Sequence, residues 1–352
     1  MDVEQWVAAR VPSRSVLLDV AGAGRPSVQV LDDQVAHLRA EAELGGYVAQ
    51  EAATPAIDAG RQALGALVGL TAADVAFADG AGTAFATLLA AWPLGRGARV
   101  GTVPSEYGAN ARVLRLLARQ RGWQLVTLPV DGDGRIEGVP DDLDLVTFPQ
   151  VASQRGVAQP VQDVFTTGTP LLLDVAQSLG QTPVPPGCAA YVGTSRKWLC
   201  GPRGVGFAVV DPHVQEALTE PPTLAPTRCT GMQRWEAQEA HVAGWVGLAT
   251  AAQQWTPDLL PVVHAGAKHA RQLLDGIGGW RVREPVDEPT GITTLVGGDP
   301  VSARARLLAD GVVTGAVPTA RSDDLEHPVL RVSTAAWVTQ DDLGRLARSL
   351  TK

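Results

Sequence analysis

LLLDVAQSLGQTPVPPGCAAYVGTSRKWLCGPRGVG, residues 171–206, is the stretch that decides the fold expected for this chain. Apolar runs at 171–173 and 189–192 predict two short, buried strands of a parallel sheet. The first run ends at Asp174, and the second leads within a few residues to Lys197. Because ligands bind at the carboxyl edge of open α/β sheets, an acid and a lysine placed there indicate a functional site.

Lysine is scarce in this sequence, and its scarcity singles out Lys197. The chain has 29 basic residues, and the only lysines are Lys197, Lys268 and Lys352. Lys268 lies in a helical run with a polar face, where a solvated side chain is expected. Lys352 is the last residue of the sequence, where order is usually low. If a lysine does covalent chemistry in this protein, we expect it to be Lys197.

Composition places the chain among ordinary globular proteins and excludes several classes. Hydrophobic residues make up 45% of the 352 residues and charged residues 19%, with a formal net charge of −8. Without a basic cluster, a nucleic-acid partner is not expected. We find no signal peptide and no apolar run long enough for a membrane span, so we expect a cytoplasmic protein. Cys188, Cys200 and Cys229 have no metal-type spacing, and no metal is expected.

Strand and helix patterns alternate along the first two thirds of the sequence. This alternation predicts an α/β fold with a seven-stranded, mostly parallel, doubly wound sheet. A short helix and a linker are expected within residues 1–15, and longer helices at 27–44 and 55–70. The expected strands of the sheet cover residues 74–78, 99–103, 124–128, 144–148, 171–174, 189–192 and 205–210.

The domain organisation follows from a proline-marked break near Thr256 and Pro257. We expect a large domain at 17–255 and a smaller C-terminal α+β domain at 256–352. The N-terminal segment, residues 1–16, is expected to pack with the small domain.

A glycine-rich turn precedes the helix expected to start near Ala84. Gly80-Ala81-Gly82-Thr83 follows a predicted strand, so its backbone N–H groups would face an anion at the helix N-terminus. Many such turns bind nothing. Because Lys197 indicates a functional site in the same protein, we interpret this turn as a phosphate site.

The pairing of Asp174 with Lys197 suggests a pyridoxal phosphate (PLP) site, since that cofactor needs an amine for covalent attachment and a carboxylate for its ring nitrogen. The alternative is a lysine in a surface turn after a core strand, and the spacing alone does not separate the two. The segments DVAQSLGQTPV and TSRKWLCGPRGVGF resemble the class V aminotransferase group of fold-type I PLP enzymes. The resemblance covers roughly residues 17–350.

The resemblance implies how the cofactor would be held. Lys197 and Asp174 would be the catalytic residues and would also bind the cofactor. The segment 105–110 resembles the family's E-H-H-x-N motif, which implies that Tyr107 stacks on the ring. The remaining implied contacts are Gln177 to the phenolic oxygen and Ala81, Gly82, Thr83, Thr194 and Arg196 to the phosphate.

The resemblance also implies a substrate site for a small molecule. VLRVS at 329–333 resembles the family's strand in which an arginine binds the substrate carboxylate, and Arg331 is the matching residue. Ser153 stands where relatives carry an asparagine near that carboxylate. Ala21 and Gly22 match a turn at the substrate entrance.

One family feature is altered in this sequence. RWEAQEAHVAG at 234–244 resembles a segment whose Gly-Thr pair contacts the partner's phosphate across a dimer interface. Here the pair is Gln238-Glu239, and a carboxylate beside a phosphate would repel it. A homodimer with its active site near the interface is still expected.

The resemblance leaves several reactions open. Cysteine desulfurases need a cysteine in the loop before the carboxylate-binding arginine, and residues 311–331 contain none. The overall pattern is most like a carbon–sulfur β-lyase that acts on a cysteine sulfoxide conjugate. An aminotransferase and a non-catalytic binding protein remain alternatives. If the conjugate carries a quaternary ammonium, aromatic residues should line its pocket, and the candidates are Trp198, Trp235, Trp337 and His241.

Overall fold

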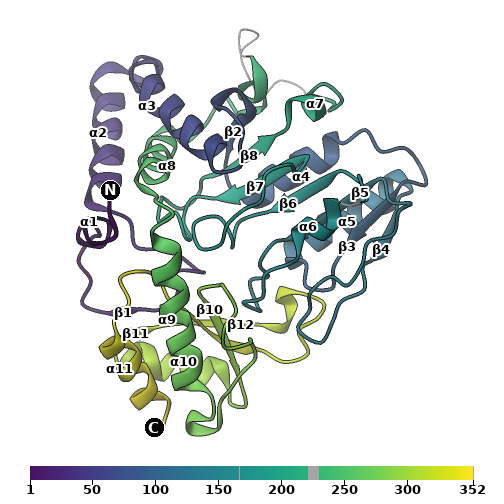
Figure 1. The fold of residues 1–352 in the computed structure, drawn as a ribbon. Helices are drawn as coiled ribbons and strands as arrows, with labels where there is room; N and C mark the ends of the chain where they lie inside the picture. Colours follow the sequence, from purple (N-terminus) through teal and green to yellow (C-terminus); the bar gives the residue numbers. More distant parts are fainter. Residues whose placement is uncertain (166, 221–229, 352) are drawn as a thin grey trace.

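The computed structural model describes residues 1–352 except 166, 221–229 and 352, so Cys229 lies outside the described residues. Its centre is a seven-stranded sheet in the order β2-β8-β7-β6-β5-β3-β4 (Figure 1). Only β8 is antiparallel to its neighbours, which confirms the mostly parallel sheet predicted from the sequence. The strands are β2 (Val75–Ala78), β3 (Arg99–Thr102), β4 (Gln124–Thr127), β5 (Leu145–Pro149), β6 (Leu171–Asp174), β7 (Ala190–Thr194) and β8 (Gly206–Val210).

Alternation of side chains along these strands builds one apolar layer on each face of the sheet. On β6, Leu171 and Leu173 join the core that includes Leu64 and Leu248, while Leu172 joins the opposite core that includes Leu88. The first face is covered by α3 (Gly46–Ala66), α6 (Val161–Phe165) and α8 (Val242–Gln254), and the second by α4 (Ala81–Ala91) and α5 (Gly108–Arg121). Burial on both faces explains why the central strands are continuous apolar runs.

Helix α3 differs from the prediction. We expected a start at Pro55, but α3 begins at Gly46 and runs through that proline. Proline removes one helical hydrogen bond, to the carbonyl of Glu51, and both residues are exposed. Water can therefore bond that carbonyl, and the helix tolerates the proline. The preceding helix, α2 (Val28–Leu44), matches the predicted range within one residue.

The C-terminal part forms a second layer below the large sheet (Figure 1). A four-stranded antiparallel sheet has the order β12-β13-β10-β9. Its elements are α9 (Leu259–Leu274), β9 (Arg281–Val282), β10 (Ile292–Val296), α10 (Pro300–Ala309), β12 (Gly315–Val317), β13 (Val329–Ser333) and α11 (Gln340–Leu350). The N-terminus joins this part, because β1 (Val16–Leu17) pairs with β11 (Val312–Val313) and Leu18 lies in its core.

Short elements complete the chain. They are α1 (Val3–Ala8), α7 (Pro212–Gln215) and the 3₁₀ turns η1 (Ala72–Asp74), η2 (Gly231–Trp235), η3 (Ile277–Gly279) and η4 (Thr319–Arg321). Within the described ranges, no helix is both long and apolar enough to cross a membrane.

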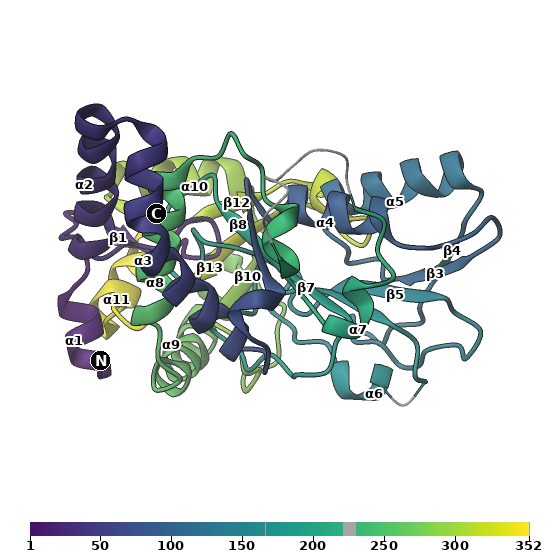
Figure 2. The same ribbon diagram turned by 90° about the horizontal axis from the view of Figure 1, so that it is seen from above.

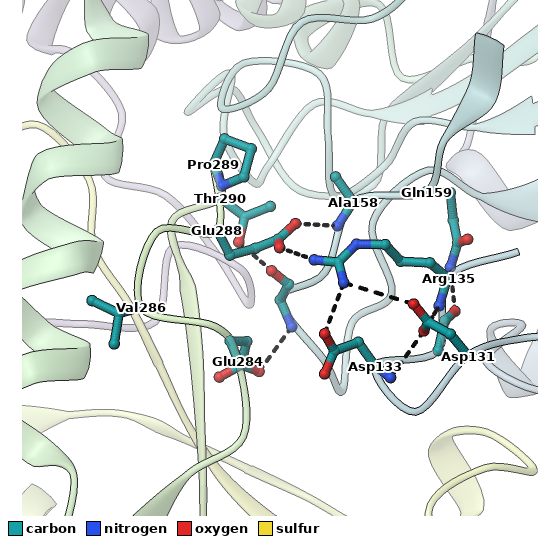
Figure 3. Close-up of polar contacts among 12 residues, drawn as sticks. Asp131, Asp133, Arg135, Ala158, Gln159, Glu284, Val286, Glu288, Pro289 and Thr290 are labelled. Atoms are coloured by element: carbon teal, nitrogen blue, oxygen red, sulfur yellow. Dashed lines mark hydrogen bonds and ion pairs between the residues drawn. The ribbon is translucent and has the colours of Figure 1, made fainter. Parts of the chain in front are cut away.

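Two buried carboxylates fasten the C-terminal part to loops of the large sheet (Figure 3). The guanidinium of Arg135 pairs with the Glu288 carboxylate, whose second oxygen accepts from the N–H of Ala158 at 2.8 Å. One oxygen of Glu284 accepts from the N–H of Gly156 at 2.9 Å. Both acceptors come from the segment between α9 and β10, and both donors follow the loop that contains Ser153. This contact therefore fixes one side of that loop.

We predict that Glu288→Ala lowers the free energy of unfolding by about 1–3 kcal/mol, because the Ala158 N–H loses its buried acceptor and Arg135 its buried partner. Asp133→Ala is the matched control: Asp133 bonds the same guanidinium at 2.8 Å, but its side chain is 42% exposed. The control should lose about 0–1 kcal/mol. Equal losses in denaturant titrations would show that the contact between the two parts is not specific.

Candidate active site

A cavity of about 740 Å³ lies where the carboxyl ends of β5, β6 and β7 face the C-terminal part. The large sheet contributes its strand ends and the turn before α4. The opposite wall comes from α10, β12, η4 and β13. Apart from the aromatic candidates for the distal pocket, all but one of the residues predicted for the site line this cavity: Ala21, Gly22, Ala81, Gly82, Tyr107, Ser153, Asp174, Gln177, Thr194, Arg196, Lys197 and Arg331. Thr83 is the exception.

Lys197 and Asp174 meet in this cavity, as the sequence predicted. Asp174 is the last residue of β6, and Lys197 follows the end of the neighbouring strand β7 by three residues. Burial lowers the pKa of the Lys197 amine from its ordinary 10.5 to about 7; Asp174 opposes this shift, and three arginines add to it. A large fraction of this amine is therefore neutral at physiological pH and can act as a nucleophile or base.

Both oxygens of Asp174 are held by hydrogen bonds. One accepts from the Ala176 N–H at 2.8 Å and the other from the Asn110 side chain at 2.9 Å. Burial raises the pKa of Asp174, while Lys197 and these two donors favour its charged form. The carboxylate is thus fixed in orientation at the base of the cavity.

Sequence reasoning missed the residues that support Asp174. Asn110 also donates to Glu106 at 3.2 Å, and that carboxyl accepts from the Tyr107 N–H at 2.7 Å. Burial, and next the charge of Asp174, raises the pKa of Glu106 to about 8, so this acid is mainly protonated at neutral pH. The signal was present, since Glu106 and Asn110 are the end residues of the motif quoted for Tyr107.

The glycine-rich turn before α4 opens toward the cavity. Gly80, Ala81 and Gly82 line it at the N-terminus of an 11-residue helix. Strand β8 passes close behind: a Cβ on Gly206 would lie 2.4 Å from the carbonyl carbon of Gly80. Only glycine permits this approach. The arrangement leaves backbone N–H groups free for an anion.

The phosphate role expected for Thr83 does not fit the geometry. Helix residues are spaced about 100° apart, so Thr83 points well away from Ala81. It lines a separate hollow of about 200 Å³ together with Trp235. Arg203 lines the main cavity instead, within the GPRG turn that leads to Gly204 and Val205. Arg203 therefore adds a positive charge to the cavity, and the sequence did not predict this role.

Two other cofactor residues are already fixed by neighbours. The Gln177 amide donates to the Ala21 carbonyl at 3.1 Å and accepts from the Trp198 indole at 3.0 Å, which determines its orientation. The Arg196 guanidinium donates to the Gly22 carbonyl, toward the substrate turn. Thr194 lies at the end of β7, with its hydroxyl 3.4 Å from the Val205 carbonyl.

Arg331 is the most connected cationic residue on the wall opposite the sheet. Its guanidinium bonds the Ser153 carbonyl at 3.0 Å and pairs with Asp19 at 2.8 Å. Its Nε is buried and has no partner among the described residues. Arg331, Ser153 and the Ala21–Gly22 turn are thereby brought together, as predicted.

Among the described residues, no tryptophan predicted for the distal pocket lines this cavity. Trp337 stacks on Trp6 with ring centroids 5.8 Å apart, outside the cavity. Trp198 lies behind Gln177 and lines a different small hollow. Neither His241 nor the substituted Gln238-Glu239 pair lines the cavity. Tyr107 is the one aromatic residue on its described lining.

The residues present fit PLP. The cavity combines a buried amine of lowered pKa, a fixed carboxylate, a glycine turn at a helix N-terminus and an exposed aromatic ring. Lys197 would hold the cofactor covalently, Asp174 would bind its ring nitrogen, and the Gly80–Gly82 turn would receive its phosphate.

Comparisons with known proteins agree with this site. A family model for class V aminotransferases matches residues 16–296. A probable hercynylcysteine sulfoxide lyase from Mycobacterium tuberculosis (strain CDC 1551 / Oshkosh) is 38% identical over 371 residues, which cover 99% of this chain and 92% of that protein.

Solved structures show the same fold at low identity. An apo cysteine desulfurase from Thermococcus onnurineus NA1 has a TM-score of 0.86 at 16% identity and covers 100% of this chain and 98% of its own. A mutant of C-DES with glycine covalently linked to the PLP cofactor has a TM-score of 0.86 at 15% identity and covers 100% and 99%. From the family match and the near full-length relative, the chain belongs to the class V aminotransferase family and is a PLP-dependent enzyme.

Proposed function

We propose that this enzyme is a carbon–sulfur β-lyase that cleaves hercynylcysteine sulfoxide to a sulfenic acid, pyruvate and ammonia, as a step of ergothioneine biosynthesis. The observation that carries the proposal is the 38% identity to a probable hercynylcysteine sulfoxide lyase over 99% of this chain. The cavity supports it, because a site of about 740 Å³ can take both a cofactor and an extended conjugate.

The chain's own residues suit this reaction. When bound, the cofactor would withdraw electrons from the substrate Cα. Lys197, with its pKa lowered to about 7, removes the Cα proton as a general base. Asp174 would hold the proton of the cofactor ring nitrogen, and Asn110 and the Ala176 N–H keep the Asp174 carboxylate in place. Arg331, which lines the cavity, binds the substrate α-carboxylate through its guanidinium.

Two other reactions are less well supported. A persulfide-forming desulfurase lacks its nucleophile, because residues 311–331 contain no cysteine. Cys188 and Cys200 are buried, and burial raises the pKa of each to about 12. An aminotransferase would use the same cofactor residues, and only product analysis separates it from a lyase. Free buried thiols suit a reducing compartment, so we place the enzyme in the cytoplasm.

A homodimer is part of the proposal. Helix α2 packs on α8 but exposes Val28, Leu31, Val35 and Leu38 along one stripe, each at least 41% exposed. Figure 2 shows α2 and α3 at the end of the molecule opposite β3 and β4. An apolar stripe of this size on a helix is typical of a protein interface.

The lyase is tested by assaying pyruvate release from hercynylcysteine sulfoxide. We expect one pyruvate per substrate with no amino acceptor present, and turnover reduced at least about 1,000-fold in Lys197→Ala, which removes the base. Lys268→Ala is the control and should be unaffected, because Lys268 is half exposed and paired with Asp287. Turnover that requires a 2-oxo acid would establish an aminotransferase instead.

Acid should suppress the reactivity of Lys197. Its pKa in the folded protein, about 7, lies below the ordinary 10.5, so the neutral amine is lost as the pH falls through 7. In cofactor-free protein, borohydride trapping of a small neutral aldehyde on Lys197 should rise about tenfold between pH 6 and pH 8. Above pH 8 the labelling of Lys197 should level off, because nearly all of its amine is then neutral. Labelling of Lys197 that keeps rising through pH 9 and pH 10 would contradict the lowered pKa.

The dimer is tested with the double variant Leu31→Asp/Leu38→Asp, which places two charges in the proposed interface. Light scattering should give twice the chain mass for the wild type and a single chain mass for the variant. Leu116→Asp on α5 is the control, because Leu116 is similarly exposed, at 46%, but lies outside the stripe. A monomeric wild type, or a dimer that survives both changes, would refute the interface.

A further inference from the structure

The cavity carries more positive charge than the proposed cofactor and α-carboxylate require. Three acids line it, Asp19, Asp79 and Asp174, against six cationic groups in a chain of net charge −8. The cationic groups are Arg196, Lys197, Arg203, Arg304, Arg321 and Arg331. A cavity of this sign inside an acidic protein favours a ligand with several negative charges.

Four of the six already have a position that explains them. Lys197 faces Asp174, and Arg331 pairs with Asp19. Arg196 bonds the Gly22 carbonyl. Arg203 lies in the turn before β8, the strand that runs close behind the glycine-rich turn Gly80–Gly82. Arg304 and Arg321 remain.

Arg304 and Arg321 both belong to the wall made by the C-terminal part. Arg321 ends η4, and its guanidinium lies 5.5 Å from the Tyr107 ring centroid. Arg304 on α10 donates its Nε to the Thr314 carbonyl at 3.1 Å, which orients the side chain and leaves its terminal nitrogens available. Within the described ranges, neither guanidinium has a carboxylate in ion-pair range.

The acids nearest in sequence to Arg304 and Arg321 bond other groups. Asp323 pairs with Arg115, and Asp324 accepts from Ser322 and from Gln154. Asp299, before α10, caps that helix by accepting from Val301 and Ser302. The two arginines are therefore open to an anion that enters the cavity.

Strand β12 connects this pair to the α-carboxylate site. Gly315 is paired in register with Arg331, and a Cβ on Gly315 would lie 3.1 Å from the Asp19 carboxylate and 3.3 Å from the Arg331 guanidinium. Ala316 and Val317 continue the lining toward η4. Along this wall, the lining runs from Arg331 past the small side chains of β12 to Arg321.

We propose that Arg321, with Arg304, forms a second anion subsite that binds a carboxylate on the sulfur-linked leaving group of the substrate. The inference rests on the proposed β-lyase function and specifies its substrate class as cysteine sulfoxides with an acidic leaving group. Hercynylcysteine sulfoxide belongs to this class, because its hercynyl group carries its own carboxylate. The single aromatic residue of the lining, Tyr107, is already beside Arg321, so anion binding and not cation–π contact selects the leaving group.

The test compares S-(2-carboxyethyl)cysteine sulfoxide with its carbamoyl analogue, which has the same shape and no charge. In the holoenzyme, Arg321→Gln should reduce kcat/KM for the acid by about 10- to 100-fold and leave the amide within about twofold, as expected for one charge-assisted pair. Arg304→Gln should show a smaller loss of the same kind. Arg306→Gln, on the same helix but outside the cavity lining, is the matched control and should change neither.

Calorimetric binding of the same two conjugates to the Lys197→Ala protein gives a readout that needs no turnover. A weaker affinity for the acid alone in Arg321→Gln supports the subsite. Equal losses for acid and amide, or no loss in either, would overturn it. If the wild type releases pyruvate from neither conjugate, the lyase proposal fails for these substrates, and the binding comparison still decides the subsite.

Discussion

The burial of an amine beside a carboxylate, at the ends of β6 and β7, is the constraint on which the rest of the site depends. Removing two charges from water is costly, and their attraction compensates only when further hydrogen bonds hold them. Asp174 obtains these from Asn110 and the Ala176 N–H. Glu106, with its pKa raised to about 8, stays mainly protonated and so does not add a full second negative charge. The result is a lysine whose amine has a pKa of about 7.

The two parts of the chain divide the work of the site. The large sheet supplies the residues that would hold the cofactor, all at strand ends or helix starts. The C-terminal part supplies the opposite wall, which includes Arg331 and Arg321 and which we propose faces the substrate. Glu284 and Glu288 fasten that part to the loop containing Ser153, so the substrate wall is held in register with the sheet.

The sequence predicts the parts of this structure that are encoded locally. Apolar runs locate all seven strands, and residues at their ends identify Asp174 and Lys197. Features that depend on helix phase or on distant contacts are missed. Thr83 adjoins the glycine turn but points away by helix geometry, and Trp337 stacks on the N-terminal Trp6. Arg321 has no local motif, and only the fold brings it beside Tyr107.

The most direct test of the central claim is to reduce the PLP-loaded protein with borohydride and map the modified peptide. Reduction fixes the covalent bond between the cofactor and the lysine that holds it. The account predicts a single label on Lys197, the buried lysine beside Asp174. A label on Lys268, or on several lysines without preference, would contradict the assignment of this cavity as the active site.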